Sequence, residues 1–220
     1  MMTPALRRVT FTAHITSSVG WVGAAMAFLA LAAIGVTSDD ERTVRGAYLV
    51  MAPAAWFVLV PLAHASLLSG IALSLGTTWG LFRHYWVVAK LLITVFATVI
   101  LLIYMGTFRE MAGVAADPVV ELALLRNASP IVHAILALIL LVVATVLGVY
   151  KPVGMTAYGK RQADAQRQAL FATTLASSGT ARPIDAGGTP PWIYVAATVA
   201  IALALLFVIL HLTGETLTHR

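Results

Sequence analysis

Residues 9–36 form an apolar run that is long enough to cross a bilayer, for which a helix needs about 20 residues. The run contains one ionisable side chain, His14, which opens the stretch HITSSVGWVGAA. Placing such a side chain against lipid is unfavourable, so we expect it to face other helices. At about 3.6 residues per turn, the side chains on the same face are Ser17, Ser18, Trp21 and Ala25. The run therefore predicts a first helix with one face turned towards the other helices of the bundle.

The rest of the chain repeats this apolar character. Its 220 residues are 60% hydrophobic and 10% charged, with a mean hydropathy of +0.91, which exceeds what a soluble domain needs. We expect an all-α integral membrane bundle in which residues 1–220 form a single transmembrane domain. The five predicted transmembrane helices are residues 9–36, 46–75, 84–105, 130–150 and 191–212, with a basic loop at 151–190. The absence of cysteine excludes disulfides and thiolate metal sites.

The distribution of charge predicts the orientation. Five crossings place the termini on opposite sides, and most Lys and Arg residues then lie on the side of the N-terminus and of the loop 151–190. The positive-inside rule assigns that side to the cytoplasm and the C-terminus to the outside of a bacterial inner membrane. Because the +5 net charge is spread among these links, we expect the lipid bilayer and no nucleic acid as partner.

Polar side chains inside the predicted helices are the candidate site. This orientation places His14, His64 and Lys90 towards the inner side, and His133 and His211 towards the outer side. Imidazoles on facing helices at one depth are what an axially ligated haem or a copper ion requires, so these four histidines are candidate metal ligands. The alternatives are structural: histidines at helix ends bind water at the headgroups, Lys90 extends to the interface, and Trp21 is a packed aromatic residue.

Three short motifs resemble the copper-resistance CopD and HemJ-type membrane proteins. His14 followed by Trp21-Val-Gly23 resembles their first-helix pattern H-x6-W-x-G, and Leu67–Gly70 resembles the LLxG that ends the next helix. The stretch Trp86-Val-Val-Ala-Lys90-Leu-Leu resembles the W-x3-K-L pattern that opens the helix after it. The resemblance covers roughly residues 10–105. One departure is Tyr104, which stands near the place of a further histidine in HemJ-type chains.

The resemblance implies a membrane protein that binds haem b for a redox role, either porphyrinogen oxidation or electron transfer. His14 would be an axial ligand, His64 its candidate partner, Trp21 a cofactor contact, and Lys90 the catalytic residue that binds a porphyrin or haem carboxylate. One alternative is an accessory protein for copper transport or resistance. Another is a non-catalytic subunit that packs, as a homo-oligomer or in a larger membrane complex, through small residues at Gly20, Gly23 and Ala24.

Overall fold

The computed structural model describes residues 2–77 and 79–175, and all its regular elements in these ranges are helical. The predicted helix 191–212 and the predicted ligand His211 lie outside the described residues. The elements in order are α1 (Pro4–Thr37), α2 (Glu41–Ala54), the π-helical turn η1 (Ala55–Leu59), α3 (Val60–Gly76), α4 (Tyr85–Ala116), α5 (Leu122–Leu125), α6 (Ser129–Tyr150) and α7 (Ala157–Leu175).

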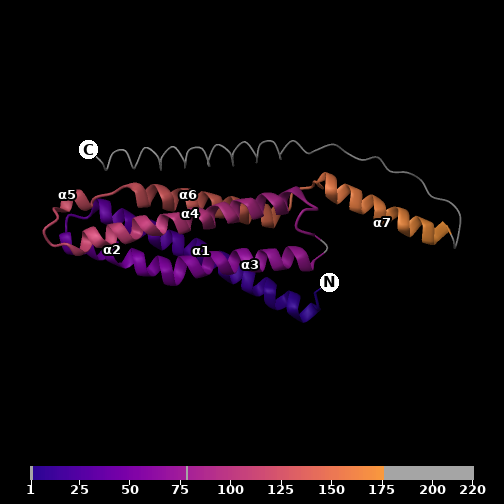
Figure 1. Cartoon of the computed structure of the whole chain (residues 1–220), viewed down its shortest axis with the longest axis horizontal. Coiled ribbons are helices and arrows are strands. Elements are labelled where there is room, and N and C mark those ends of the chain that lie inside the picture. Colours follow the sequence, from indigo (N-terminus) through magenta and orange to yellow (C-terminus); the bar gives the residue numbers. More distant parts are fainter. Residues whose placement is uncertain (1, 78, 176–220) are drawn as a thin grey trace.

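Four helical segments are long and apolar enough to cross a membrane. They are α1, the continuous segment Glu41–Gly76, α4 and α6, and they lie side by side along the long axis of the molecule (Figure 1). The all-α fold is therefore confirmed, and the first four predicted membrane helices have the length and apolar character that crossing requires. Exposed Phe57, Val99 and Val146 on these helices are suited to contact with lipid, since hydrocarbon is the solvent inside a bilayer.

The predicted inward face of the first crossing is correct. Ser17, Trp21 and Ala25 of α1 are buried, and Trp21 is only 3% exposed. On α4 the buried polar positions are Thr94 and Thr98. Each threonine hydroxyl donates to the carbonyl four residues earlier, which lets a polar group lie inside the bundle without an unpaired donor.

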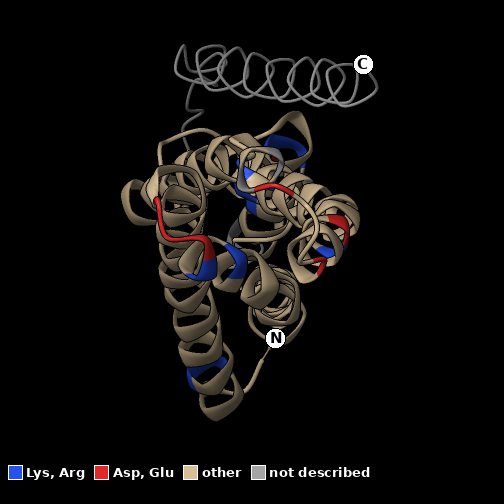
Figure 2. Cartoon of the chain, turned by 90° about the vertical axis from the view of Figure 1, so that its left-hand side faces the viewer, with Lys and Arg blue, Asp and Glu red and all other residues tan. Residues whose placement is uncertain are grey.

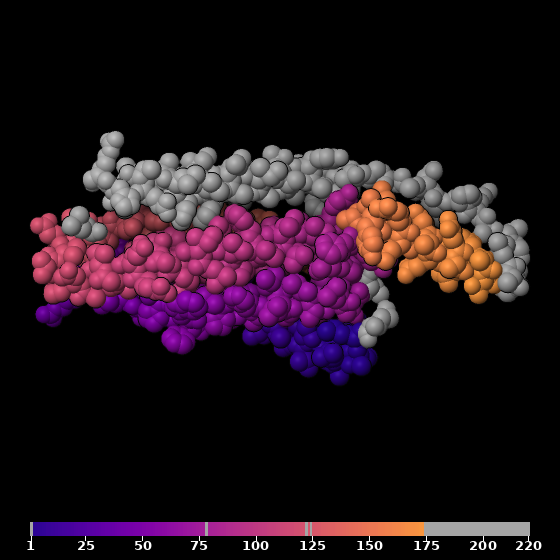
Figure 3. Space-filling model, viewed as in Figure 1, coloured from indigo at the N-terminus to yellow at the C-terminus, as the bar shows by residue number. Residues whose placement is uncertain are grey.

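Four boundaries differ from the sequence prediction by several residues, and two of these are starts: α1 begins at Pro4 and α2 at Glu41, each five residues earlier than expected. The helix expected at 84–105 continues as α4 to Ala116, because the buried Phe108 and Ala115, on either side of the charged Arg109–Glu110 pair, extend its buried face. The polar segment predicted as a loop at 151–190 contains α7, whose N-terminus is capped by the hydroxyl of Thr156 accepting from the backbone N–H of Gly159. Figure 3 shows α7 extending beyond the end of the packed helices.

The second crossing accommodates two prolines without ending. Pro53 lies inside α2 and Pro61 lies in the first turn of α3, with η1 between them. Each proline lacks a backbone N–H donor, so the regular ladder of the α-helix is interrupted there. A π-helical turn is a common way to absorb such an interruption.

The bundle has two chemically different ends. The acidic end is formed by the link between α1 and α2 and by the segment from the end of α4 to the start of α6, and Figure 2 views the molecule from this end. The basic end is formed by the start of α1, the link between α3 and α4, the end of α6, and α7.

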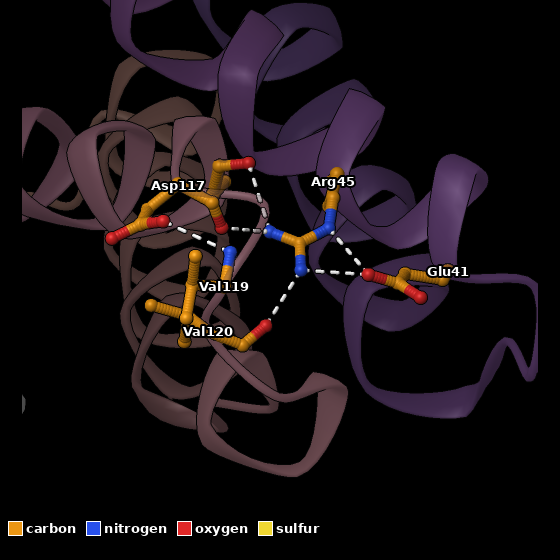
Figure 4. Close-up of polar contacts among 6 residues, drawn as sticks. Glu41, Arg45, Asp117, Val119 and Val120 are labelled. Carbon is orange, nitrogen blue, oxygen red and sulfur yellow. Dashed lines mark hydrogen bonds and ion pairs between the residues drawn. The ribbon is translucent and has the colours of Figure 1, made fainter.

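Arg45 holds the acidic end together. Its guanidinium pairs with Glu41 at 2.7 Å and donates to the carbonyls of Ala115, Asp117 and Val120 at 3.2, 2.7 and 2.6 Å (Figure 4). The arginine therefore ties α2 to the segment that follows α4. Its side chain is only 14% exposed, so these partners also compensate its desolvation.

Candidate functional site

A polar cavity of about 310 Å³ lies at the basic end, among α1, α3, α4 and α6. We call it the polar cavity. Its lining residues are Arg7, Phe11, His14, Ser66, Leu67, Gly70, Ile71, Leu73, Ser74, Thr77, Trp79, Trp86, Val87, Lys90, Leu91, Thr94, Gly148 and Lys151. Its volume is at the lower end of the range of about 300–1,000 Å³ that is typical of small-molecule sites.

His14 and Lys90 meet at the wall of this cavity. The ammonium of Lys90 lies 3.1 Å from Nε2 of His14, and Nδ1 of His14 lies 3.1 Å from the backbone carbonyl of Ser66. A carbonyl oxygen only accepts, so Nδ1 carries the ring proton and Nε2 accepts from Lys90. The hydroxyl of Ser69 lies 3.1 Å from the same Nδ1. Three transmembrane segments therefore fix the tautomer and the orientation of one imidazole.

Two glycines make room for this pair. A Cβ at Gly70 would lie 3.1 Å from Cε1 of His14, and a Cβ at Gly148 would lie 3.2 Å from Nζ of Lys90. Both distances are tighter than an ordinary van der Waals contact. The side chains of His14 and Lys90 thus occupy the space that a side chain on α3 or α6 would fill.

The charge of the polar cavity is of one sign. Arg7, Lys90 and Lys151 line it together with His14, and none of the described residues that line it is Asp or Glu. Lys151 is held over the ring of Trp79, with its Nζ 5.5 Å from the ring centroid. A buried or half-buried cation needs a counter-charge or water, so the cavity is suited to an anionic group.

The structure does not bring His64 to this site. His64 lies on α3, two residues before Ser66, so it points to a different side of the helix. Its Nδ1 lies 2.8 Å from the carbonyl of Val60, and it is not among the residues that line the cavity. In the described ranges no group of three His, Cys, Asp or Glu side chains is placed to hold a metal ion.

Trp21 and His133 line a second pocket instead, between α1, η1, α4 and α6. This apolar pocket has a volume of about 80 Å³ and is lined mainly by aliphatic and aromatic side chains. The His133 ring stacks on Tyr104 with centroids 4.0 Å apart, and its Nδ1 donates to the carbonyl of Ser129 at 2.8 Å. Seven residues separate His14 from Trp21, or about 10 Å along a helix, which explains why they belong to different pockets.

Several contributors to the polar cavity had no individual signal in the sequence. Ser66, Ser69 and Gly148 contact or make room for the His14–Lys90 pair, but which faces of α3 and α6 point inward is decided by packing. The LLxG motif was the one available signal, since its glycine is Gly70. Comparison with models of protein families, with curated proteins and with solved structures found no match for this chain.

Proposed function

We propose that this multi-pass membrane protein binds a carboxylate-bearing tetrapyrrole in the polar cavity and takes part in its redox chemistry. The observation that carries the proposal is the Lys90–His14 contact in a cavity where the described lining residues include cations and no carboxylate. A ligand carboxylate would supply the missing negative charge. The choice of a porphyrin or porphyrinogen among carboxylate ligands rests on the resemblance of the motifs around His14, Gly70 and Lys90 to HemJ-type proteins.

Each basic group has a distinct part in such a complex. Lys90, held by Nε2 of His14, would donate the remaining N–H bonds of its ammonium to a ligand carboxylate. His14 would position that ammonium, since its ring is fixed from the other side by Ser66. Arg7 and Lys151 lie on the exposed rim and would attract the anion before it binds.

The described residues fit a bound carboxylate better than an axially ligated haem iron. The Nε2 atom that would ligate iron is in contact with Lys90, and among the described residues His14 is the only histidine that lines the cavity. We therefore propose the tetrapyrrole as a substrate held by its carboxylates and not as a resident haem b. For a copper site the described residues offer no cluster of donor side chains.

The test compares a porphyrin free acid with its neutral methyl ester. The full chain in lipid nanodiscs is titrated with protoporphyrin and with protoporphyrin dimethyl ester, and binding is followed by the Soret band and by porphyrin fluorescence. We expect tighter binding of the free acid. Lys90→Met should weaken it by roughly 10- to 100-fold, the effect of losing a charge-assisted hydrogen bond, while Lys90→Arg retains much of the affinity.

The matched control is Arg109→Met, which removes an exposed cation on α4 at the other end of the bundle. It should leave the preference for the free acid unchanged. Equal affinity for acid and ester in the wild type would refute the proposal. So would equal losses in Lys90→Met and Arg109→Met at equal folded yield, because the effect would then reflect net charge rather than the site.

We also propose that the basic end faces the cytoplasm, which the excess of Lys and Arg at this end supports. The chain contains no cysteine, so single cysteines can be introduced without removing native ones. In intact cells a membrane-impermeant maleimide should label Val119→Cys, which is 86% exposed at the acidic end, and not the exposed Gln166→Cys on α7. The reverse labelling pattern would overturn the orientation.

A further inference from the structure

The rim of the polar cavity carries a second lysine, Lys151, in an unusual backbone conformation. Lys151 follows the last residue of α6 with φ 43° and ψ 61°, and within residues 2–77 and 79–175 it is the only non-glycine residue with a positive φ. A Cβ makes this left-handed conformation unfavourable, so glycine is the usual residue at such a helix end. The turn itself would be served by glycine, and what lysine adds at this position is its side chain.

Trp79 holds the ammonium of this lysine. The Nζ atom of Lys151 lies 5.5 Å from the centroid of the Trp79 ring, and among the described residues Lys151 forms no ion pair. The tryptophan is fixed in turn, since its carbonyl accepts from Nδ1 of His84 at 2.9 Å and its ring makes edge contacts with those of His84 and Trp86. A ring face engages one side of an ammonium, so its other N–H bonds can be donated to an anion.

The two links that carry these side chains are tied to each other by their backbones. The tryptophan belongs to the link between α3 and α4, and the lysine to the link between α6 and α7. The N–H of Tyr85 donates to the carbonyl of Gly154 at 3.3 Å. The N–H of Thr156 donates to the carbonyl of Arg83 at 3.0 Å. The lysine is exposed, but its place at the mouth of the cavity is therefore defined by the fold.

Lys90 and Lys151 border the same cavity at different depths. The Nζ atom of Lys90 lies next to Gly148, where an added Cβ would be 3.2 Å away. Lys151 comes three residues later, about 4.5 Å further along α6 towards the basic end. No carboxylate among the described lining residues neutralises either lysine. A carboxylate bound at Lys90 therefore leaves a second cation for another anionic group of the same ligand.

We propose that the polar cavity recognises two anionic groups of one ligand, the first at Lys90 and the second at Lys151, with Trp79 as the residue that positions Lys151. This rests on the proposed function, which supplies a carboxylate ligand, and it adds a selectivity. A dicarboxylate binds more tightly than the monocarboxylate with the same skeleton. In a tetrapyrrole, two carboxylate arms on the same edge of the ring meet this requirement.

The experiment compares three porphyrins that differ only in their free carboxylates. Protoporphyrin, its monomethyl ester and its dimethyl ester are titrated into the full chain in phosphatidylcholine nanodiscs, and binding is followed by the Soret band. We expect the wild type to bind the diacid about three- to tenfold more tightly than the monoester, and the monoester more tightly than the diester. The preference for the diacid then exceeds the statistical advantage of carrying two carboxylates.

The variants assign the diacid preference to the rim. Lys151→Gly suits the left-handed backbone, so it should fold as well as the wild type while losing the diacid preference and keeping that for the monoester over the diester. Lys151→Arg should retain both preferences. Trp79→Leu should reduce the diacid preference, and Trp79→Phe, which keeps an aromatic face, should retain more of it.

The matched control is Arg161→Met, which removes an exposed cation on α7 at the same end and does not line the cavity. It should leave the diacid preference unchanged. Equal affinity for diacid and monoester in the wild type would overturn recognition of two groups, whereas equal affinity for all three porphyrins would refute the proposed function itself. Equal losses in Lys151→Gly and Arg161→Met would also overturn the inference, because the effect would reflect net charge. An unchanged diacid preference in Trp79→Leu would remove Trp79 from the site, and if that variant does not fold, an unchanged preference in Lys151→Gly overturns the inference alone.

Discussion

The two ends of the bundle use cations in opposite ways. At the acidic end, Arg45 is enclosed by one carboxylate and three backbone carbonyls, and Arg126 pairs with Asp39 at 2.9 Å. At the basic end, Lys90 contacts an imidazole at the edge of a cavity that no acidic side chain lines within residues 2–77 and 79–175. A cation whose partners all belong to the chain stabilises the fold, whereas one that borders open space can bind a ligand.

This difference predicts opposite consequences for stability and binding. Removing Arg45 should affect every property that requires a folded bundle. Removing Lys90 should affect ligand binding and leave the fold intact. No carboxylate among the described lining residues pairs with this lysine, so its removal leaves no buried charge unpaired. The predictions below begin with the largest effect.

The largest effect is expected from Arg45→Met. The change leaves the carbonyls of Ala115, Asp117 and Val120 without this donor and Glu41 without its ion pair, which should lower the free energy of unfolding by about 2–4 kcal/mol. The measurement is unfolding in mixed detergent micelles. The exposed neighbour Arg42→Met is the control and should change stability by less than about 0.5 kcal/mol. Equal destabilisation of the two variants would show that Arg45 does not hold this end together.

The next effect is expected on binding rather than on folding, from Gly148→Ala. The new methyl group would lie 3.2 Å from Nζ of Lys90, so the ammonium must shift by a few tenths of an ångström from its position beside His14. We expect weaker protoporphyrin binding, by roughly three- to tenfold, since a displacement of this size costs about 1 kcal/mol. Gly23→Ala is the control, because nothing lies within 4 Å of the added Cβ. Normal affinity in Gly148→Ala would separate the lysine from the binding site.

A smaller effect is expected from Ser18→Ala, which tests the link between α1 and α3 beside the cavity. The hydroxyls of Ser18 and Ser66 lie 2.7 Å apart, and Ser66 is only 5% exposed. Removing one partner should destabilise the protein by about 1 kcal/mol, while Ser18→Ala combined with Ser66→Ala should cost less than the sum of the two single changes. Additive losses in this double-mutant cycle would show that the hydroxyls do not interact.

The sequence predicted the four apolar helices and singled out two residues, His14 and Lys90, that are in contact in the structure. Apolar run length and the period of α1 were sufficient to place His14 on an inward face, and alternating crossings placed Lys90 at its depth. The predicted pairing of His14 with His64 did not take into account which face of α3 is turned towards α1. Ser66 contacts His14, and His64 lies two positions away, about 200° around the helix, so both residues cannot face His14.

What the sequence could not supply is contact across the bundle. The closure around Arg45 depends on the path of the chain after α4, which no local pattern of residues encodes. Trp21 lines the apolar pocket and not the polar cavity, and this depends on which side chains of the other helices pack against α1 at the position of Trp21. The helix α7 is not predicted because its composition is polar and it has no apolar periodicity. The hydroxyl of Thr156, which caps its N-terminus, is the local signal that the sequence contains.

The smallest effect concerns the helix cap at the acidic end and its dependence on pH. Hydrogen bonds from the hydroxyl and backbone N–H of Thr43 lower the pKa of the Asp40 carboxyl below its ordinary value. A lowered pKa means that this carboxylate contributes to stability at pH above the ordinary value of about 4, and that the contribution is lost as the pH falls through the lowered pKa.

Asp40→Asn keeps a side-chain acceptor at the N-cap but does not titrate. The difference in unfolding midpoint between wild type and Asp40→Asn should therefore be constant near neutral pH and change only below about pH 4. In a Thr43→Val background the total change between neutral and low pH should be smaller, because the side-chain hydrogen bond that is the main cause of the lowered pKa is gone. If the total change is the same in both backgrounds, Thr43 is not the group that stabilises the carboxylate. The effect stays small because Asp40 is exposed to solvent, in contrast to Arg45, which is enclosed one turn further along the same helix.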